Sequence, residues 1–368
     1  MRVALLTYST KPRGGVVHTL ALAESLARRG VEVDLWTLGR GGDTAFFRQV
    51  EPAVRVHAVP FPDVGDAVGP RIVRSISVLA AAFAARREHY DVVHAQDCIS
   101  ANAAMASGPC VRTIHHLDTF TTPELAACHE RAVVEPVARI CVSAAVAGEV
   151  RRGWGLEPTV IANGVEAHRF AAGARDDVGR ERWRGRLGRY VLAVGGIEPR
   201  KGTTDLLEAF ALLRARHPDV GRGLRLVLAG GETLFDYRGY RGTFDRRAAE
   251  LDVQPELLGV VAHDELPALV AEAAALGFVS TQEGFGLAPL EALAAGTPVV
   301  ARDLPVLREV LGEAVAYAAD PVAMADALAA VIASPPDPAA GRARAQAFTW
   351  DAAAAAHLRF YERLVTAA

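Results

Sequence analysis

Residues 277–296 read Gly-Phe-Val-Ser-Thr-Gln-Glu-Gly-Phe-Gly-Leu-Ala-Pro-Leu-Glu-Ala-Leu-Ala-Ala-Gly. The run 277–279 has the composition of a buried strand, and 287–295 has the length and composition of a helix. Between them lies a glycine-rich loop that carries a carboxylate. This order is typical of α/β proteins, in which helices cover both faces of a parallel sheet. Loops that follow such strands line the place where ligands bind.

The same order of strand, loop and helix recurs in both directions from this stretch. Further helices are expected at 16–29, 72–87, 203–216 and 264–274. Residues 171–188 are rich in Ala, Gly, Arg and Asp and contain no strand candidate, so we expect the connection between two domains there. The pattern predicts an α/β protein with two Rossmann-like, doubly wound domains that face a central cleft. The predicted strands are 3–7, 31–38, 54–59, 91–95, 111–115, 139–143, 159–161, 190–194, 224–229, 257–259, 277–279 and 298–301.

Length, composition and charge fit this two-domain interpretation. The chain has 368 residues, of which 51% are hydrophobic and 23% are charged, as in ordinary globular proteins. Its 40 Lys and Arg residues and 43 Asp and Glu residues give a net charge of −3. The sequence therefore lacks the basic excess of a general nucleic-acid binder.

The sequence also predicts where the protein resides. It has no apolar run of about eighteen residues, the length that a transmembrane helix needs. The first residues lack the apolar segment and small-residue cleavage site of a signal peptide. The four cysteines (Cys98, Cys110, Cys128 and Cys141) form no Cys-x-x-Cys pair, which favours a cytoplasmic protein with reduced thiols.

Two glycine loops follow predicted strands and open helices, where backbone N–H groups favour an anion. Gly14 and Gly15 form the first loop, and a tight turn with positive φ is an equally good interpretation of it. The second loop, 195–202, places Arg200 and Lys201 beside the start of a helix. Cations are unfavourable there unless an anion accompanies them, so we expect a bound phosphate or diphosphate. The alternative is a solvated surface pair.

The stretch 277–296 supplies two carboxylates. Glu283 lies in the loop, and Glu291 lies about one turn into the predicted helix. Carboxylates suit vicinal hydroxyls, because each can accept two hydrogen bonds. The amides of the Gly-Phe-Gly segment are expected to face a diphosphate at the helix N-terminus. The alternative is that Glu291 is a solvated helix residue and Glu283 is a charge at the helix N-terminus.

Polar residues also end two strands in the first half. His115, His116 and Asp118 could bind a metal or move a proton, but their spacing matches no compact ligand pattern, and we expect no metal site. His94 is equally well interpreted as a satisfied buried histidine. Ser143 lacks the context of a nucleophile elbow, so no Ser-His-Asp triad is expected.

Taken together and in order, these motifs resemble the retaining glycosyltransferases of family 4, the glycosyl transferases group 1 with the GT-B fold. The resemblance covers nearly the whole chain. Gly196 departs from it, because the family often has an arginine there that helps to hold the pyrophosphate, and Arg200 is the obvious substitute. Ala162 and Glu166 are two further departures. The matching segments are Gly14-Gly15, Thr113-Ile-His115, Val160-Ile-Ala-Asn163-Gly164-Val165 with Arg169-Phe170, Lys201-Gly202, Glu283 through Glu291, and Phe348-Thr-Trp350.

The resemblance implies how the chain is divided. Residues 1–175 would form an N-terminal, acceptor-binding Rossmann-like domain. Residues 176–345 would form the C-terminal domain that binds the nucleotide-sugar donor, and 346–368 a helix that crosses back to the first domain. It also implies that a sugar moves from a UDP- or GDP-linked donor to an acceptor hydroxyl with retained anomeric configuration. The donor is a co-substrate, and no cofactor or metal is implied.

The resemblance further implies roles for the site residues. Arg200 and Lys201 would stabilise the departing diphosphate, together with the amides around Phe285. Glu283 would bind sugar hydroxyls and Glu291 the ribose, with His115 beside the donor sugar. The implied catalytic residues are His115, Arg200, Lys201 and Glu283. The implied donor-binding residues are Gly14, Gly15, Gly196, Arg200, Lys201, Glu283, Gly284, Phe285, Gly286, Leu287 and Glu291.

Two other functions stay open on the sequence: a nucleotide-sugar 2-epimerase of similar fold, and a non-catalytic nucleotide-sugar-binding protein. The acceptor is a small molecule, a lipid or a glycan, and the loops 10–13, 61–71 and 119–124 would line its site. A weak peripheral membrane contact is conceivable at the helix around 72–87, which arginines flank, but its Ala-rich middle favours a core helix. The sequence assigns no oligomeric state.

Overall fold

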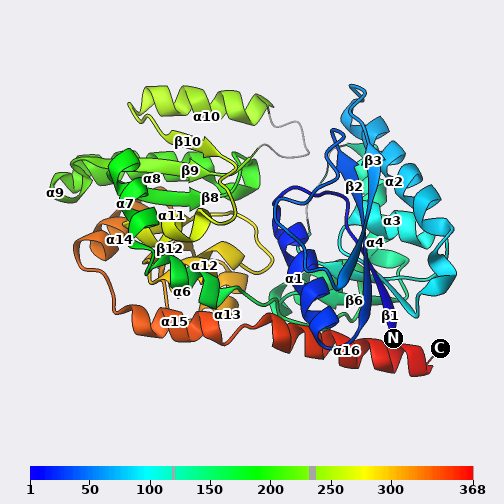
Figure 1. The fold of residues 1–368 in the computed structure, drawn as a ribbon. Helices are drawn as coiled ribbons and strands as arrows, with labels where there is room; N and C mark the ends of the chain where they lie inside the picture. The colour runs from blue at the N-terminus through cyan, green and yellow to red at the C-terminus, as the bar shows by residue number, and fades with distance from the viewer. Residues whose placement is uncertain (118–119, 121, 232–237, 368) are drawn as a thin grey trace. The chain divides into compact units, whose positions relative to one another are not determined.

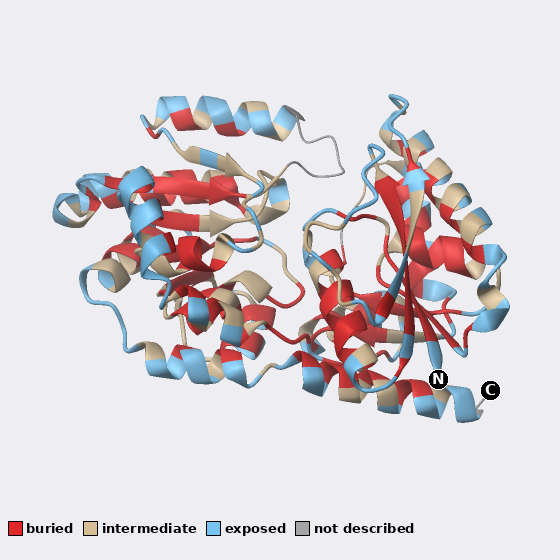
Figure 2. Cartoon of the chain, in the orientation of Figure 1, coloured by how far each residue is buried: buried red, intermediate tan, exposed pale blue. Residues whose placement is uncertain are grey.

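A computed structural model of the chain describes residues 1–117, 120, 122–231 and 238–367. The chain forms two compact units (Figure 1). Unit 1 is Met1–Gly164 with Thr349–Ala368, and unit 2 is Val165–Phe348. Each unit has one parallel sheet covered by helices, and its strands are mostly buried while the outer faces of the helices are exposed (Figure 2). The predicted α/β architecture is confirmed.

The sheet of unit 1 has 7 strands in the order β3-β2-β1-β4-β5-β6-β7, and its paired strands are parallel. The strand order reverses between β1 and β4, and a doubly wound sheet binds ligands outside the carboxyl ends of its strands at such a point. The strands are β1 (Arg2–Leu6), β2 (Glu32–Arg40), β3 (Val54–Phe61), β4 (Val92–Ala95), β5 (Val111–Ile114), β6 (Ala138–Cys141) and β7 (Thr159–Val160).

The helices of unit 1 cover both faces of this sheet. One core joins α1 and α16 to the sheet, and another joins α2 and α3 to it. The C-terminal helix α16 packs against α1, so the two ends of the chain build one core. The helices are α1 (Gly14–Arg28), α2 (Val68–Ala84), η1 (Arg87–His89), α3 (Cys98–Met105), α4 (Pro123–Val134), α5 (Ala144–Trp154) and α16 (Trp350–Ala367).

The sheet of unit 2 has 6 strands in the order β10-β9-β8-β11-β12-β13, again with parallel pairs and a reversal between β8 and β11. Its strands are β8 (Arg189–Val194), β9 (Leu224–Ala229), β10 (Glu256–Gly259), β11 (Ala275–Phe278), β12 (Val299–Arg302) and β13 (Ala316–Ala318). Its helices are α6 (Ala167–Gly173), α7 (Asp177–Leu187), η2 (Pro199–Lys201), α8 (Thr203–Arg216), α9 (Pro218–Gly221), α10 (Arg238–Glu250), α11 (Leu266–Glu272), α12 (Leu287–Ala295), α13 (Pro305–Leu311), α14 (Pro321–Ala333) and α15 (Pro338–Gln346).

The strands expected from the sequence are all present, with ends shifted by two residues at most. Strand β13 was not predicted, because its three residues carry no run of hydrophobic residues long enough to mark a strand. It pairs with β12 at the edge of the sheet, where a short strand suffices.

The expectation of a connection between domains at 171–188 is wrong. These residues hold the end of α6 and the whole of α7, both in unit 2. The side chain of Asp176 caps α7 by accepting the Gly179 N–H at 2.9 Å, and Trp183 is buried. An arginine-rich helix that buries so few side chains has little apolar periodicity, which is why the sequence pattern missed it.

The chain passes between the units at Gly164–Val165 and again at Phe348–Thr349, rather than at residues 175 and 345. A Cβ on Gly164 would lie 2.2 Å from the backbone nitrogen of Trp350, so the two crossing segments touch through their backbones within unit 1. The segment Thr349–Ala368 belongs to unit 1.

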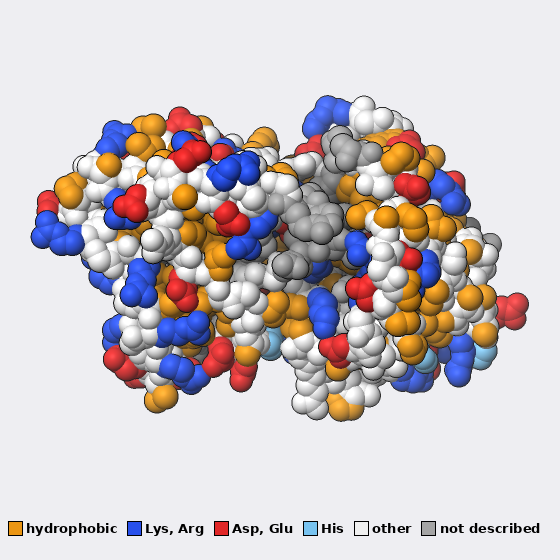
Figure 3. All heavy atoms as spheres, turned by 90° about the horizontal axis from the view of Figure 1, so that it is seen from above, with side chains coloured by type: hydrophobic (Ala, Val, Ile, Leu, Met, Phe, Trp, Pro, Cys, Tyr) orange, Lys and Arg blue, Asp and Glu red, His pale blue; other side chains and the backbone are white. Residues whose placement is uncertain are grey.

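Helix α2 packs against the sheet of unit 1 as a core helix does. Its buried residues include Ile72, Leu79 and Phe83. Arg74 bonds to Asp66 at 2.6 Å instead of standing free. No helix within the described part of the chain has the length and apolar character needed to cross a membrane. Figure 3 shows Lys and Arg side chains interspersed with Asp and Glu on the face that it presents.

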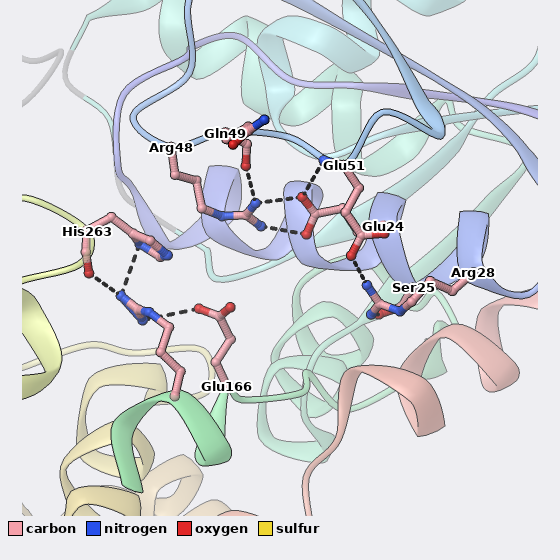
Figure 4. A network of polar contacts seen from close by, with 9 residues as sticks. Glu24, Ser25, Arg28, Arg48, Gln49, Glu51, Glu166 and His263 are labelled. Carbon is pink, nitrogen blue, oxygen red and sulfur yellow. Dashed lines mark hydrogen bonds and ion pairs between the residues drawn. The ribbon is translucent and has the colours of Figure 1, made fainter. Parts of the chain in front are cut away.

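A buried ion pair fastens the connection between β2 and β3 to α1 (Figure 4). Both Nη atoms of Arg48 bond to the carboxylate of Glu24, at 2.6 and 2.8 Å, and the Glu51 N–H donates to the same carboxylate at 3.2 Å. Glu24 is buried, so this two-pronged pairing is what makes its charge tolerable inside unit 1.

Three buried histidines meet where α1, β4 and α16 pack together. The ring of His357 lies 6.1 Å from that of His18 and 5.7 Å from that of His94. His18 shares a 2.8 Å hydrogen bond with the side chain of Asn163, and His94 shares one of 2.6 Å with the Tyr361 hydroxyl. Burial lowers the pKa of His18 to about 3 and that of His357 to about 4, and it lowers the pKa of His94 well below the usual value.

We therefore predict that acid destabilises unit 1 strongly. These histidines are neutral when folded and take up protons on unfolding below pH 6.5, so stability is complete above that pH and is lost as the pH falls toward 4. Each should cost about 2 kcal/mol between pH 7 and pH 5. Urea unfolding across this range measures the loss. His357→Gln should reduce the pH dependence by about one proton, whereas the exposed His89→Gln should leave it unchanged. Equal slopes for both variants would contradict the assignment.

Candidate functional site

In unit 2, the loops after β8, β9 and β11 meet through their backbones. A Cβ on Gly230 would lie 2.2 Å from the carbonyl oxygen of Gly195. A Cβ on Gly202 would lie 2.3 Å from the carbonyl oxygen of Val279. Gly195 and Gly202 also have φ values of +143° and +60°, which side chains disfavour. The glycines of the 195–202 loop are therefore required by this close packing at the carboxyl edge of the sheet.

The packing brings Arg200, Lys201 and Glu283 together. The carboxylate of Glu283 bonds to Lys201 Nζ at 2.5 Å and to Arg200 Nη1 at 3.2 Å. The Thr281 N–H donates to the Arg200 carbonyl at 2.8 Å and ties the two loops together. The Glu283 side chain is only 10% exposed and those of the two cations about 20%, so the charges interact in partial isolation from water. This group is called the Glu283 cluster below.

The cluster is not a solvated surface pair, which was the alternative interpretation of Arg200 and Lys201. Its two cations lie on η2 and directly precede α8, where the helix N-terminus adds positive potential. Glu198 also lies 3.9 Å from Arg200, so two carboxylates accompany the two cations in this structure.

Helix α12 begins after Gly286, whose φ is +103°. Its N-cap residue, Gly286, has no side chain that could accept a hydrogen bond from the first turn, so the backbone N–H groups there can serve a ligand. The ring of Phe285 is buried and packs edge-on against Phe348 at 5.3 Å, so Phe285 can offer a ligand its backbone but not its ring. Gly284 directly precedes Phe285, and Leu287 is the first residue of α12.

Glu291 belongs to a second charge group. Burial raises its pKa to about 7, while the nearby Arg169 lowers it and Glu166 raises it. Arg169 bonds to Glu166 at 3.2 Å and to the carbonyl oxygen of His263 at 2.6 Å (Figure 4). The described contacts therefore place Glu283 and Glu291 in different surroundings. Arg169 and His263 were not proposed as site residues. The one signal for His263 in the sequence is its position in the loop after β10.

In unit 1, Gly14 and Gly15 begin α1. Neither has a positive φ, so the alternative of a left-handed tight turn is wrong. A Cβ on Gly15 would lie 3.6 Å from the ring of His115, which places that histidine beside the start of the helix. The Nε2 atom of His115 is buried with no hydrogen-bond partner among the described residues, and burial holds its pKa well below the usual value.

Two further polar side chains lie near this edge. Thr10, in the predicted acceptor loop 10–13 after β1, and Gln96, after β4, which was not predicted, are both buried. The hydroxyl of Thr10 and both amide atoms of Gln96 have no hydrogen-bond partner in the part of the chain that the structure describes. Buried polar atoms usually have a partner, and these follow the two strands between which the strand order reverses. A bound ligand would supply the missing partner.

Arginines gather beside them. Arg40, at the end of β2, donates to the Tyr8 carbonyl at 3.1 Å and to the Ser75 hydroxyl at 3.1 Å. Burial, together with the positive charges of Arg71 and Arg13, lowers its pKa to about 10, against the opposing effects of Tyr8 and Asp97. Three guanidinium groups close enough to repel one another favour a nearby anion.

Within the described ranges, no group of three or more His, Cys, Asp or Glu residues could hold a metal ion. His94 is a satisfied buried histidine, hydrogen-bonded through both ring nitrogens. Asp118, which the sequence offered as a candidate ligand, lies outside the described residues, as do Thr119 and Thr121 of the predicted acceptor loop.

Comparison with known protein families matches both halves of the chain. Residues 182–347 match the model of "Glycosyl transferases group 1", and residues 12–169 match that of "Glycosyltransferase Family 4". The phosphatidyl-myo-inositol mannosyltransferase of Mycobacterium tuberculosis is 30% identical and covers 98% of this chain and 97% of its own. The D-inositol 3-phosphate glycosyltransferase of Geodermatophilus obscurus is 30% identical and covers 95% and 86% respectively.

Solved structures support the same fold. Sucrose-phosphate synthase from Thermosynechococcus elongatus superposes with a TM-score of 0.79 over 100% of both chains at 21% identity. Anabaena HepE, solved in complex with UDP and glucose, superposes with a TM-score of 0.76 over 98% of this chain and 99% of its own at 19% identity.

The packing of the glycines yields a prediction. Gly202→Ala should lower the free energy of unfolding by about 1–3 kcal/mol, because its Cβ meets a carbonyl oxygen and its φ is positive. Gly185→Ala, in the open on α7, should raise stability by about 0.5–1 kcal/mol. Urea unfolding of both variants measures the difference. The same sign for both changes would show that the backbone contact at Gly202 does not constrain the loop.

Proposed function

The chain belongs to the family 4 glycosyltransferases, the glycosyl transferases of group 1 with the GT-B fold, and from that premise we propose the following reaction. A sugar moves from a nucleoside-diphosphate donor to an acceptor hydroxyl with retention of its anomeric configuration. The observation that carries this proposal is the Glu283 cluster at the reversal of strand order in unit 2.

The Glu283 cluster supplies the electrostatics that a departing diphosphate requires. In the proposed complex the diphosphate takes the place of Glu283 as partner of Arg200 and Lys201, and the free N–H groups at the start of α12 add to their field. Glu283 is then available to accept hydrogen bonds from sugar hydroxyls. Because Arg200 shares this carboxylate with Lys201, it is well placed to act for the family arginine that Gly196 replaces.

We propose that no metal takes part. The cations and the helix N-termini bear the charge of the leaving group, and that phosphate accepts the proton of the acceptor hydroxyl. For His115, whose neutral ring lies beside the start of α1, we keep the proposed role of a contact to the donor sugar. The two alternatives, an epimerase and a non-catalytic binding protein, are not favoured, since the sequence relatives named above are all transferases.

For the acceptor, we propose a molecule that bears a phosphate group. Arg13, Arg40 and Arg71 gather at the carboxyl edge of the unit 1 sheet beside the uncapped N-terminus of α1. Both sequence relatives described above are named for inositol phosphates or phosphatidylinositol. UDP-linked sugars are the donors to test first, because HepE was solved with UDP. The same screen includes GDP-linked sugars and lipid acceptors, and it also tests for weak membrane contact.

Lys201→Ala should lower the transfer rate about 10²–10³-fold, because it removes one preorganised donor to the developing charge. The assay uses a panel of nucleotide sugars, with and without EDTA, on wild type and on the exposed Arg214→Ala control at the far end of α8. Lys11 and Lys201 are the only lysines in the sequence, so amine labelling gives an independent measurement. Nucleoside diphosphate should protect Lys201 and leave Lys11 reactive. Unchanged turnover and unprotected Lys201 would refute the assignment, and activity lost in EDTA would refute metal independence.

Substitution of the two glutamates should change the kinetics in different ways. Glu283→Gln should mainly lower kcat, since the sugar must be held while charge builds at its anomeric carbon. Glu291→Gln should mainly raise the donor KM and weaken binding of the nucleoside diphosphate, because we assign it to the ribose. With a pKa of about 7, Glu291 accepts two hydrogen bonds only above that pH, so wild-type affinity should fall as the pH drops through 7. Calorimetry across this range tests both points. Lost diphosphate affinity in Glu283→Gln alone would reverse the roles.

Arg40→Gln should raise the KM for a phosphate-bearing acceptor about 10–100-fold, the loss expected for a hydrogen bond to a charged group. Steady-state kinetics compare each acceptor with its dephosphorylated form, and Arg28→Gln, at the exposed far end of α1, serves as control. An equal effect of Arg40→Gln on both forms of the acceptor would mean that Arg40 has no part in phosphate recognition.

A further inference from the structure

Cys98 and Cys128 are held together by one amide. Cys98 is the first residue of α3, Cys128 lies in the middle of α4, and these helices pack against each other. The Nδ2 atom of Asn102 donates to the carbonyl oxygen of Cys98 and to that of Cys128, both at 2.8 Å, and lies 3.4 Å from the Cys128 sulfur. All four cysteines of the chain are free thiols.

The two thiols differ in exposure and contact each other. Cys98 is partly exposed, whereas Cys128 is buried. A hydrogen bond to the Cys98 side chain raises the pKa of the Cys128 thiol, and burial adds to the effect. The other two cysteines, Cys110 and Cys141, are buried.

A buried cation accompanies the pair. Arg112, on β5, is 6% exposed, and its charge interacts with Cys98, Cys110 and Cys128. Its Nε and Nη1 atoms have no hydrogen-bond partner among the described residues. Cys98 lies at the start of α3, next to the N-cap residue Asp97, and unlike Cys128 it is partly exposed, so a peroxide in solution can reach it.

We propose that Cys98 and Cys128 form a reversible oxidation site, in which Cys98 reacts with a hydroperoxide and Cys128 resolves the product. The Cys98 thiolate attacks one peroxide oxygen, the O–O bond breaks, and the sulfenic acid and one water result once a proton is taken up. The Cys128 sulfur then attacks the Cys98 sulfur, the S–O bond breaks and a second water leaves. Two thiols lose two electrons to one hydrogen peroxide, which becomes two waters.

The disulfide would join the start of α3 to the middle of α4. These helices follow β4 and β5, and Gln96 and His115 are the first residues after those strands, so oxidation would restrain the two segments that carry those side chains. A dithiol reductant reverses the step by thiol–disulfide exchange. The site does not depend on the proposed glycosyl transfer.

The experiment treats the full-length Cys110→Ser protein with equimolar hydrogen peroxide, blocks remaining thiols, digests with trypsin and maps the products by mass spectrometry. Trypsin releases Cys98 in peptide 88–112 and Cys128 in 113–131, so in this variant each peptide carries a single cysteine. We expect these two peptides to be joined, two hydrogens lighter than their sum, and separated again by dithiothreitol.

Two further variants identify the roles. Oxidation of the Cys128→Ser protein should stop at a sulfenic acid on Cys98, which dimedone traps. In the Cys98→Ser protein, which lacks the partly exposed thiol, Cys128 should stay reduced. The Cys141→Ser protein should form the disulfide as the wild type does. This variant also tests the proposal without a substitution near Cys98 and Cys128. A linkage that involves Cys141 would overturn the proposal, as would a Cys98 that resists peroxide or is oxidised without ever joining Cys128.

Discussion

The close contact of three backbone loops in unit 2 determines where its charged groups lie. Gly202 lies against the Val279 carbonyl and Gly230 against that of Gly195, at distances that no Cβ would allow. Because these loops touch, Lys201 and Arg200 from one of them reach Glu283 from another. The N-termini of α8 and α12 are directed toward the same carboxyl edge of the sheet, as the parallel topology requires.

Partial burial strengthens the electrostatic interactions of these charges. Glu283 has little contact with water and two cationic partners, and Glu198 lies 3.9 Å from Arg200, so the two positive charges are balanced by two carboxylates. In the proposed complex, a diphosphate that replaces the carboxylate would find cations already oriented, so little reorganisation would accompany the reaction. Glu291 is treated differently by its surroundings, which raise its pKa instead of pairing it with a cation at short range. One motif thus supplies two carboxylates with different electrostatics.

Unit 1 has a different polar interior. Its histidines are kept neutral by burial and by hydrogen bonds that α16, from the far end of the chain, helps to form. Buried atoms of Thr10, Gln96 and His115 stand without described partners near the reversal of strand order, and arginines gather beside them. These features are the reason we propose a polar, anionic acceptor for this unit and expect the unit to be sensitive to acid.

The sequence by itself determined the α/β class, nearly every strand and the membership of the Glu283 cluster, because these depend on local periodicity and on glycine-rich loops after apolar runs. It could not reveal α7, whose many arginines hide the few buried residues of the helix, or the pairing of Arg169 with Glu166 and His263. It also gave no sign that Asn102 gathers Cys98 and Cys128, or that His18, His94 and His357 share one core. Only tertiary structure decided these, since packing brings together residues far apart in the chain, and burial, not residue type, then sets their pKa values and their chemistry.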